Sequence, residues 1–90
     1  MYSKEVEIIN KTGLHARPAS EFTRKAIEFQ SNINITNVTL GKEGNGKSII
    51  SVMSMGLAQG MMLKVTAEGD DETEAVETLV ALVEGGFGEV

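Results

Sequence analysis

The stretch Asn10-Lys11-Thr12-Gly13-Leu14-His15-Ala16-Arg17-Pro18-Ala19-Ser20 separates an alternating apolar pattern from a helical one, and it holds the chain's single histidine and single proline. Gly13 permits a sharp turn because glycine adopts a positive φ at little cost. Pro18 suits the first turn of a helix, where its missing N–H has no intrahelical acceptor in any case. The stretch therefore predicts a turn followed by a helix that begins near His15.

His15 is predicted at or near the N-cap of this helix. A helix N-terminus attracts anions because its first N–H groups and the helix dipole present positive charge. Arg17 adds a guanidinium whose planar set of donors suits phosphate. A histidine followed by an arginine can also be an ordinary surface feature, but the glycine, the proline and the change of pattern favour a site. Because imidazole is a nucleophile, we predict that His15 carries a phosphoryl group.

Both flanks of this stretch have a clear periodicity. Residues 2–9 alternate and predict a half-buried strand, with Val6 and Ile8 directed at the core. Residues 16–28 follow helical spacing, with four apolar side chains on one face: Ala19, Phe22, Ala26 and Phe29. The second pattern predicts an amphipathic helix packed against the rest of the chain.

A second strand is indicated by the apolar residues Ile33, Ile35, Val38 and Leu40. Their parity slips between Ile35 and Val38, and a one-residue slip would send the later side chains to the other face. We predict a bulge near Thr36-Asn37 that repairs the slip, a turn at Leu40-Gly41 and a short third strand near residues 42–46. The alternative is a tight turn at Thr36-Asn37, with residues 38–40 as the return strand.

Ser48 is predicted as the N-cap of a short helix that runs from Ile49 to Met55 and ends at Gly56. This helix is unusually apolar, with Ile49, Ile50, Val52, Met53 and Met55. So short an element cannot bury all of them, and an exposed apolar patch commonly marks a partner site. We therefore expect part of this helix to be a docking surface.

The remaining pattern is a strand over residues 61–68 and a helix over residues 71–84 that ends at Gly85-Gly86. The helix has a buried face of Ala75, Leu79, Leu82 and Val83. No uniform strand–helix–strand crossover repeats along the chain. We therefore predict a single α+β domain over residues 1–90, with helices on one face of a mostly antiparallel sheet.

Composition argues against several classes of protein. Ninety residues allow one small domain. No apolar run approaches the ~20 residues of a membrane span, and the first residues lack the apolar core of a signal peptide. The absence of cysteine excludes disulfides and thiolate metal sites and fits a cytoplasmic chain. A single histidine argues against a histidine-clustered metal site.

The net charge of −5 argues against direct nucleic-acid binding, which needs a positive surface. The charge is uneven: residues 1–47 carry seven Lys or Arg and five Asp or Glu, a net of +2, whereas residues 48–90 carry one Lys and eight Asp or Glu, a net of −7. The less acidic half suits an anion site or an acidic partner, although the acidic half can equally be a solvated helix face. Glu21 and Lys25 are predicted to form an ion pair worth ~0.2–0.5 kcal/mol.

Two motifs resemble those of the HPr family, the histidine-containing phosphocarriers of the bacterial sugar phosphotransferase system. Thr12-Gly13-Leu14-His15-Ala16-Arg17-Pro18-Ala19 matches the family's phosphohistidine motif. Lys47-Ser48-Ile49-Ile50-Ser51-Val52-Met53-Ser54-Met55-Gly56 resembles its regulatory-serine motif in the form typical of Gram-positive bacteria. The resemblance implies an open-faced β-sandwich in which three helices cover one face of a four-stranded antiparallel sheet, in the order β-α-β-β-α-β-α.

By this resemblance, His15 accepts a phosphoryl group on Nδ1 from phosphorylated enzyme I and passes it to sugar-specific IIA domains. Arg17 assists the transfer, and Thr12, Ala16 and Pro18 shape the helix start that holds the phosphate. The chain is then a covalent intermediate in phosphotransfer and not a stand-alone enzyme, and neither a cofactor nor a metal is implied.

The resemblance also implies that Ser48 is phosphorylated by HPr kinase/phosphorylase, which makes His15 a poorer acceptor. The phosphoserine form serves Gram-positive relatives as corepressor for a catabolite-control transcription factor. The helix N-cap role of Ser48 is compatible with this, because a phosphate there gains from the same N–H groups. The implied docking surface around the histidine comprises Ser20, Arg24, Ile49, Ile50 and Met53.

This chain departs from the common family pattern in a few places. His15 and Ser48 are about two residues further apart, an insertion that we place in the region of the second strand, and Gly44 and Ser51 replace residues that are often larger or differently shaped. One alternative is a regulatory interaction protein of the same family that acts mainly through phospho-Ser48, against which the retained His15 argues. Another is a carrier in nitrogen-linked phosphotransfer, against which the regulatory-serine motif argues.

Overall fold

Strands and helices follow one another in the order that the sequence predicts. The computed structural model describes residues 1–88. Its elements are β1 (Tyr2–Glu7), α1 (Ala16–Ile27), β2 (Asn32–Asn37), β3 (Lys42–Asn45), α2 (Ile49–Ser54), β4 (Met62–Glu68), α3 (Glu72–Glu84) and the short 3-10 turn η1 (Gly86–Gly88). This order confirms the predicted α+β class.

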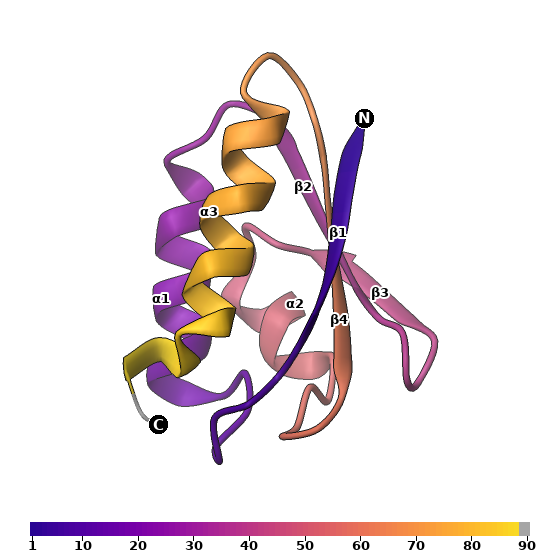
Figure 1. Cartoon of the computed structure of the whole chain (residues 1–90), viewed down its shortest axis with the longest axis vertical. Helices are drawn as coiled ribbons and strands as arrows, with labels where there is room; N and C mark the ends of the chain where they lie inside the picture. The colour runs from indigo at the N-terminus through magenta and orange to yellow at the C-terminus, as the bar shows by residue number, and fades with distance from the viewer. Residues whose placement is uncertain (89–90) are drawn as a thin grey trace.

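The strands of residues 1–88 form one antiparallel sheet in the order β1-β4-β2-β3. Figure 1 shows α1, α2 and α3 on the same side of this sheet, while its other face is left open. The predicted open-faced β-sandwich is therefore confirmed. In the part of the chain that the structure describes, no helix is both long and apolar enough to cross a membrane.

The core lies between the sheet and the helices, because alternation along a strand sends every second side chain to the helical face. Val6 and Ile8 are buried there, as the alternation of residues 2–9 predicts. The buried apolar residues of the other strands are Ile33 and Ile35 from β2 and Leu63, Val65 and Ala67 from β4. The helices cover them with Ala19, Phe22 and Ala26 from α1 and Ala75, Val76, Leu79, Val80 and Val83 from α3. Leu82, which was predicted to be buried, is only half-buried.

The prediction of a bulge near Thr36-Asn37 is wrong. β2 pairs with β4 in an unbroken register through Asn37, and the strand then ends. The buried Asn37 side chain makes the turn, because its Oδ1 accepts from the Leu40 N–H (3.0 Å) and its backbone carbonyl accepts from the Gly41 N–H (2.7 Å). Val38 and Leu40 therefore lie exposed in the turn, 43% and 50% respectively, and not in a strand. The turn at Leu40-Gly41 and the third strand are confirmed.

At the end of the molecule away from His15, one carboxylate links two connections between secondary-structure elements. Asp71, at the start of α3, accepts hydrogen bonds from the backbone N–H groups of Gln30 and Ser31, each at 2.9 Å, and from the Ser31 hydroxyl. Because Gln30 and Ser31 lie between α1 and β2, these bonds tie two connections that are far apart in sequence. The relative position of α1 and α3 depends in part on this contact.

Candidate functional site

The turn that carries His15 is anchored to the segment that precedes β4. The Leu14 N–H donates to the Leu57 carbonyl (2.9 Å), and both of these side chains are fully buried. Further back, the Ile8 N–H donates to the Met61 carbonyl (2.9 Å), and the Ile8 carbonyl accepts from the Gly60 N–H (2.8 Å). These bonds hold the backbone on either side of the turn, so the start of α1 has a fixed position.

Gly13 and Asn10 set the shape of this turn. Gly13 has φ +66, and a Cβ on it would lie 2.2 Å from the Leu57 carbonyl oxygen, so any other residue would strain the turn. The buried Asn10 side chain donates through Nδ2 to the Gly13 carbonyl (2.9 Å) and to the Thr12 hydroxyl (3.2 Å). Thr12, predicted to support the site, is thus placed in the turn itself.

His15 is the N-cap residue of α1, as the sequence predicts. Its backbone is extended, with φ −127 and ψ 160, and its side chain is exposed. Within residues 1–88 the imidazole makes no capping hydrogen bond to α1. The first turn of a helix points its N–H groups outward, and the first turn of α1 carries no acidic side chain. The ring therefore lies at the positive end of a helix.

Ala16 and Pro18 define how α1 begins. Ala16 has φ +50, a left-handed conformation that costs a non-glycine residue roughly 1–2 kcal/mol. Pro18 is buried within the first turn, where a proline fits without losing an intrahelical hydrogen bond. The chain thus changes direction sharply at Ala16, immediately after the histidine.

Within residues 1–88, Arg17 is bonded to two groups that the sequence did not predict. Its Nη1 donates to Glu21 Oε1 (2.7 Å) and its Nη2 to the Phe87 backbone carbonyl in η1 (3.3 Å). Lys25 pairs with Glu28 (3.3 Å), so the predicted ion pair of Glu21 with Lys25 is wrong. Arg17 and Glu21 also stand four residues apart, so the spacing allowed this pair as well as the predicted one.

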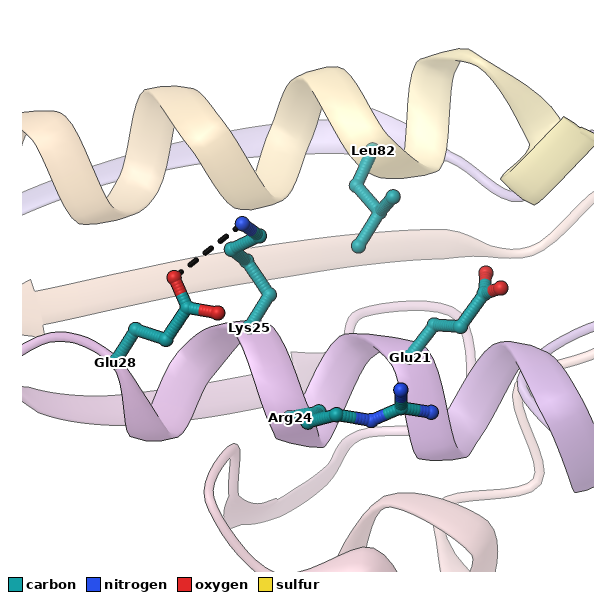
Figure 2. A pocket seen from close by; sticks show the side chains of 5 residues that line it. All are labelled: Glu21, Arg24, Lys25, Glu28 and Leu82. Atoms are coloured by element: carbon teal, nitrogen blue, oxygen red, sulfur yellow. Dashed lines mark hydrogen bonds and ion pairs between the residues drawn. The ribbon is translucent and has the colours of Figure 1, made fainter.

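A groove of about 340 Å³ lies next to Glu21, between α1 and α3. Figure 2 shows Glu21, Arg24, Lys25 and Glu28 on α1, with Leu82 on α3 opposite them. The half-buried Leu82 forms the apolar part of the groove, and the four charged side chains of α1 form the rest. The groove is therefore lined by side chains of both charges. One of them, Glu21, also forms the ion pair with Arg17.

Ser48 is the N-cap of α2, as predicted, and its Oγ accepts from the Ser51 N–H (3.3 Å). The half-buried Ser51 has a second role, because its hydroxyl accepts from the Asn45 N–H (3.0 Å) and so ties α2 to β3. A Cβ on Gly44 would lie 2.8 Å from Ser51 Oγ and 2.9 Å from Met55 Sδ. Gly44, one departure from the common family pattern, thus leaves room for Ser51, the other.

The predicted docking residues lie on two neighbouring helices, since α1 packs against α2. On α2, Ile49 is 41% exposed, Ile50 79% and Met53 41%, which confirms the exposed apolar surface on this helix. On α1, Arg24 donates to the Ser20 hydroxyl (3.4 Å) and is exposed.

Leu40 extends this apolar surface beyond the predicted set. A Cβ on Gly56 would lie 3.5 Å from Leu40 Cδ1, so Leu40 borders the C-terminal end of α2. Leu40 was absent from the predicted docking set because the apolar pattern placed it at the end of a strand. Among residues 1–88, no group of three or more His, Cys, Asp or Glu side chains is placed to hold a metal ion.

Comparisons with known proteins agree with this architecture. A family model described as the PTS HPr component phosphorylation site matches residues 2–85. Phosphocarrier protein HPr of Haemophilus influenzae is 47% identical over 83 residues, 92% of this chain and 95% of the relative. HPr-like protein Crh of Halalkalibacterium halodurans is 44% identical over 84 residues, 93% of this chain and 98% of the relative.

A solved structure of a relative has the same fold. A crystal structure of HPr-C-His from Thermoanaerobacter tengcongensis superposes with a TM-score of 0.93 at 49% identity, covering 100% of this chain and 99% of the other. The likeness therefore extends over the sheet, the three helices and the turn before α1. This chain belongs to the HPr family, the phosphocarriers of the bacterial phosphotransferase system.

Proposed function

We propose that His15 is the phosphoryl acceptor of this carrier. It takes the group from phosphorylated enzyme I and passes it to sugar-specific IIA domains in the cytoplasm. The observation that carries the proposal is the position of the ring: exposed, on the N-cap of α1, and making no capping bond within residues 1–88. A capping side chain would have its acceptor atom occupied, whereas this imidazole is available to a partner protein.

The chemistry is a nucleophilic displacement at phosphorus. A lone pair of one imidazole nitrogen forms the new N–P bond while the bond from phosphorus to the donor breaks, and the other ring nitrogen keeps its proton. The new phosphoryl group carries negative charge next to the first turn of α1, which stabilises it. Because positioning and charge stabilisation are shared with the partner, the chain acts as a carrier and does not turn over a substrate alone.

Ser48 is the proposed regulatory site, modified by HPr kinase/phosphorylase. Its hydroxyl is half-buried and bonded to the Ser51 N–H, so a phosphate on it would meet the same helix terminus. Ile49, Ile50 and Met53, with Ser20 and Arg24 on the adjacent helix, form the proposed docking surface. A phosphate on Ser48 would add charge next to this surface and weaken the docking of enzyme I.

The second candidate is a regulatory protein that acts mainly through phospho-Ser48 on a catabolite-control transcription factor. The 44% identity to an HPr-like protein Crh favours it. The retained His15 argues against it as the main role.

Incubation with enzyme I and phosphoenolpyruvate separates the two candidates. We expect an acid-labile, base-stable phosphate on the wild-type chain and none on His15→Ala. The matched control is Ser48→Ala, which we expect to be phosphorylated at His15 like the wild type. No phosphate on the wild type, or equal labelling of His15→Ala, would contradict the carrier proposal.

A further inference from the structure

Among residues 1–88, Arg17 has two acceptors on the α3 side of α1. The Glu21 carboxylate lies one helical turn further along α1 and takes the ion pair at 2.7 Å, and the Phe87 carbonyl of η1 takes a second hydrogen bond at 3.3 Å. Figure 2 shows the Glu21 side chain pointing from α1 towards α3. Because the two bonds come from different nitrogens of one planar group, they fix the direction of the guanidinium as well as its place.

A phosphoryl group on His15 would compete for the same guanidinium. Arginine pairs strongly with phosphate, and Arg17 lies in the helical turn that follows the histidine. To turn towards the phosphoryl group, the Arg17 guanidinium must weaken its ion pair with Glu21. The free energy lost from that pair offsets part of the free energy gained from the phosphate. The carboxylate of Glu21 thus acts on the phosphorylated form without touching the phosphate.

We propose that Glu21 is a positioning residue for Arg17 that keeps the phosphohistidine easy to pass on. This inference rests on the proposed function of His15. By holding the guanidinium, Glu21 limits how far Arg17 stabilises the phosphorylated form, so the phosphoryl group remains transferable to the next partner. The transfer itself is unchanged: one N–P bond forms at His15 as the donor's bond to phosphorus breaks.

The size of the effect follows from the exposure of the pair. The side chains of Arg17 and Glu21 are 54% and 31% exposed, and ion pairs of this kind are weak because water screens them. We therefore expect Glu21→Gln to raise the equilibrium constant for phosphorylation of His15 by enzyme I about threefold, and to slow onward transfer to a IIA domain by a similar factor. A larger change in this equilibrium constant would need an ion pair that is buried from water.

A double-mutant cycle tests whether the effect passes through Arg17. The equilibrium fraction of phosphohistidine is measured by ³¹P NMR with enzyme I and a fixed ratio of phosphoenolpyruvate to pyruvate, for wild type, Glu21→Gln, Arg17→Ala and the double variant. We expect Glu21→Gln to shift the fraction in the wild-type background and to have no effect in the Arg17→Ala background. Glu28→Gln, which removes a similar charge from the same helix where it pairs with Lys25, is expected to change nothing.

The outcomes distinguish this inference from the proposed function. Phosphorylated wild type with no shift in Glu21→Gln would overturn the role of Glu21 and leave the carrier intact. An equal shift in the Arg17→Ala background would also overturn it, because it would show a direct effect of the Glu21 charge. No phosphate on the wild type would overturn the carrier and the inference together. Urea unfolding of each variant checks that all of them are folded.

Discussion

Helices α1 and α2 begin in similar ways. In each, a tightly packed glycine stands two residues before an N-cap residue with an extended backbone: Gly13 before His15, with φ −127 at the cap, and Gly46 before Ser48, with φ −113. The two differ in what the cap side chain does. Ser48 accepts from the Ser51 N–H, whereas the His15 ring makes no capping bond within residues 1–88.

This difference separates a cap side chain that is left exposed from one that stabilises its helix. The His15 ring is not needed to hold α1, so a phosphoryl group can come and go without changing the helix start. The Ser48 hydroxyl is part of α2, so a phosphate there must replace a hydrogen bond that stabilises the helix. These differences suit the proposed roles of His15 as the carrier site and of Ser48 as the regulatory site.

The largest effect expected from this comparison is on the two glycines. Gly13→Ala should lower the free energy of unfolding by about 3 kcal/mol, because it combines a left-handed backbone with a Cβ 2.2 Å from a backbone carbonyl. Gly46→Ala should lower it by about 1–2 kcal/mol, because its Cβ would crowd Ile33 Cγ2 at 2.6 Å but no left-handed backbone is involved. Urea denaturation of both variants measures the difference. Equal losses would show that the left-handed turn before His15 adds nothing.

Periodicity predicted most of the fold. The spacing of Val6 and Ile8 identified a half-buried strand, and the spacing of Ala19, Phe22 and Ala26 identified the buried face of α1. The prediction failed at the end of β2, where Val38 and Leu40 look like strand residues but lie exposed in a turn. The decisive group is the buried Asn37 side chain, which makes the turn. Asparagine is common in turns, but the apolar residues on both sides of it favoured a continued strand.

The residues of the site were predicted, but the contacts between them were not. His15 and Ser48 were recognised as helix starts because Gly, Pro and Ser have local conformational effects that a sequence reveals. The partners of Arg17 were not, because the Phe87 carbonyl is seventy residues away and only the tertiary fold brings it close. Glu21 had two possible i,i+4 partners, Arg17 and Lys25, and sequence spacing cannot choose between them.

A smaller effect is expected from the cap side chains. Ser48→Ala should lower the free energy of unfolding by about 1 kcal/mol, because it removes the acceptor for the Ser51 N–H. His15→Ala should change it by less than about 0.5 kcal/mol, because no capping bond is lost within the described chain. The midpoint of urea unfolding, followed by circular dichroism, measures both. A loss at His15 as large as that at Ser48 would make the imidazole a structural cap.

The start of α3 shows a third kind of cap residue. Its N-cap residue, Asp71, also makes no capping bond within residues 1–88, yet its carboxylate is engaged elsewhere, by Gln30 and Ser31. The hydrogen bond from the Ser31 hydroxyl, with those from the two backbone N–H groups, lowers the pKa of Asp71 below its usual 3.8. A side chain released from capping is therefore a candidate for chemistry only where it is also exposed at a turn built to present it, as His15 is.

The smallest effect is a pH dependence at Asp71. Because the folded pKa lies below the unfolded one, this carboxylate stabilises the fold above about pH 4, and its contribution is lost as pH falls through the folded pKa. Asp71→Asn should lower the urea midpoint at pH 7 and shrink the further drop between pH 5 and pH 2. Part of that drop should remain, because Glu72 and Glu77 also have lowered pKa values, from hydrogen bonds with the N-terminal amine and with Tyr2 respectively. Asp70→Asn removes the same charge one residue earlier and is expected to leave the midpoints unchanged. An unaltered acid dependence in Asp71→Asn would mean that the Asp71 contact with Gln30 and Ser31 is not what stabilises this end of the fold.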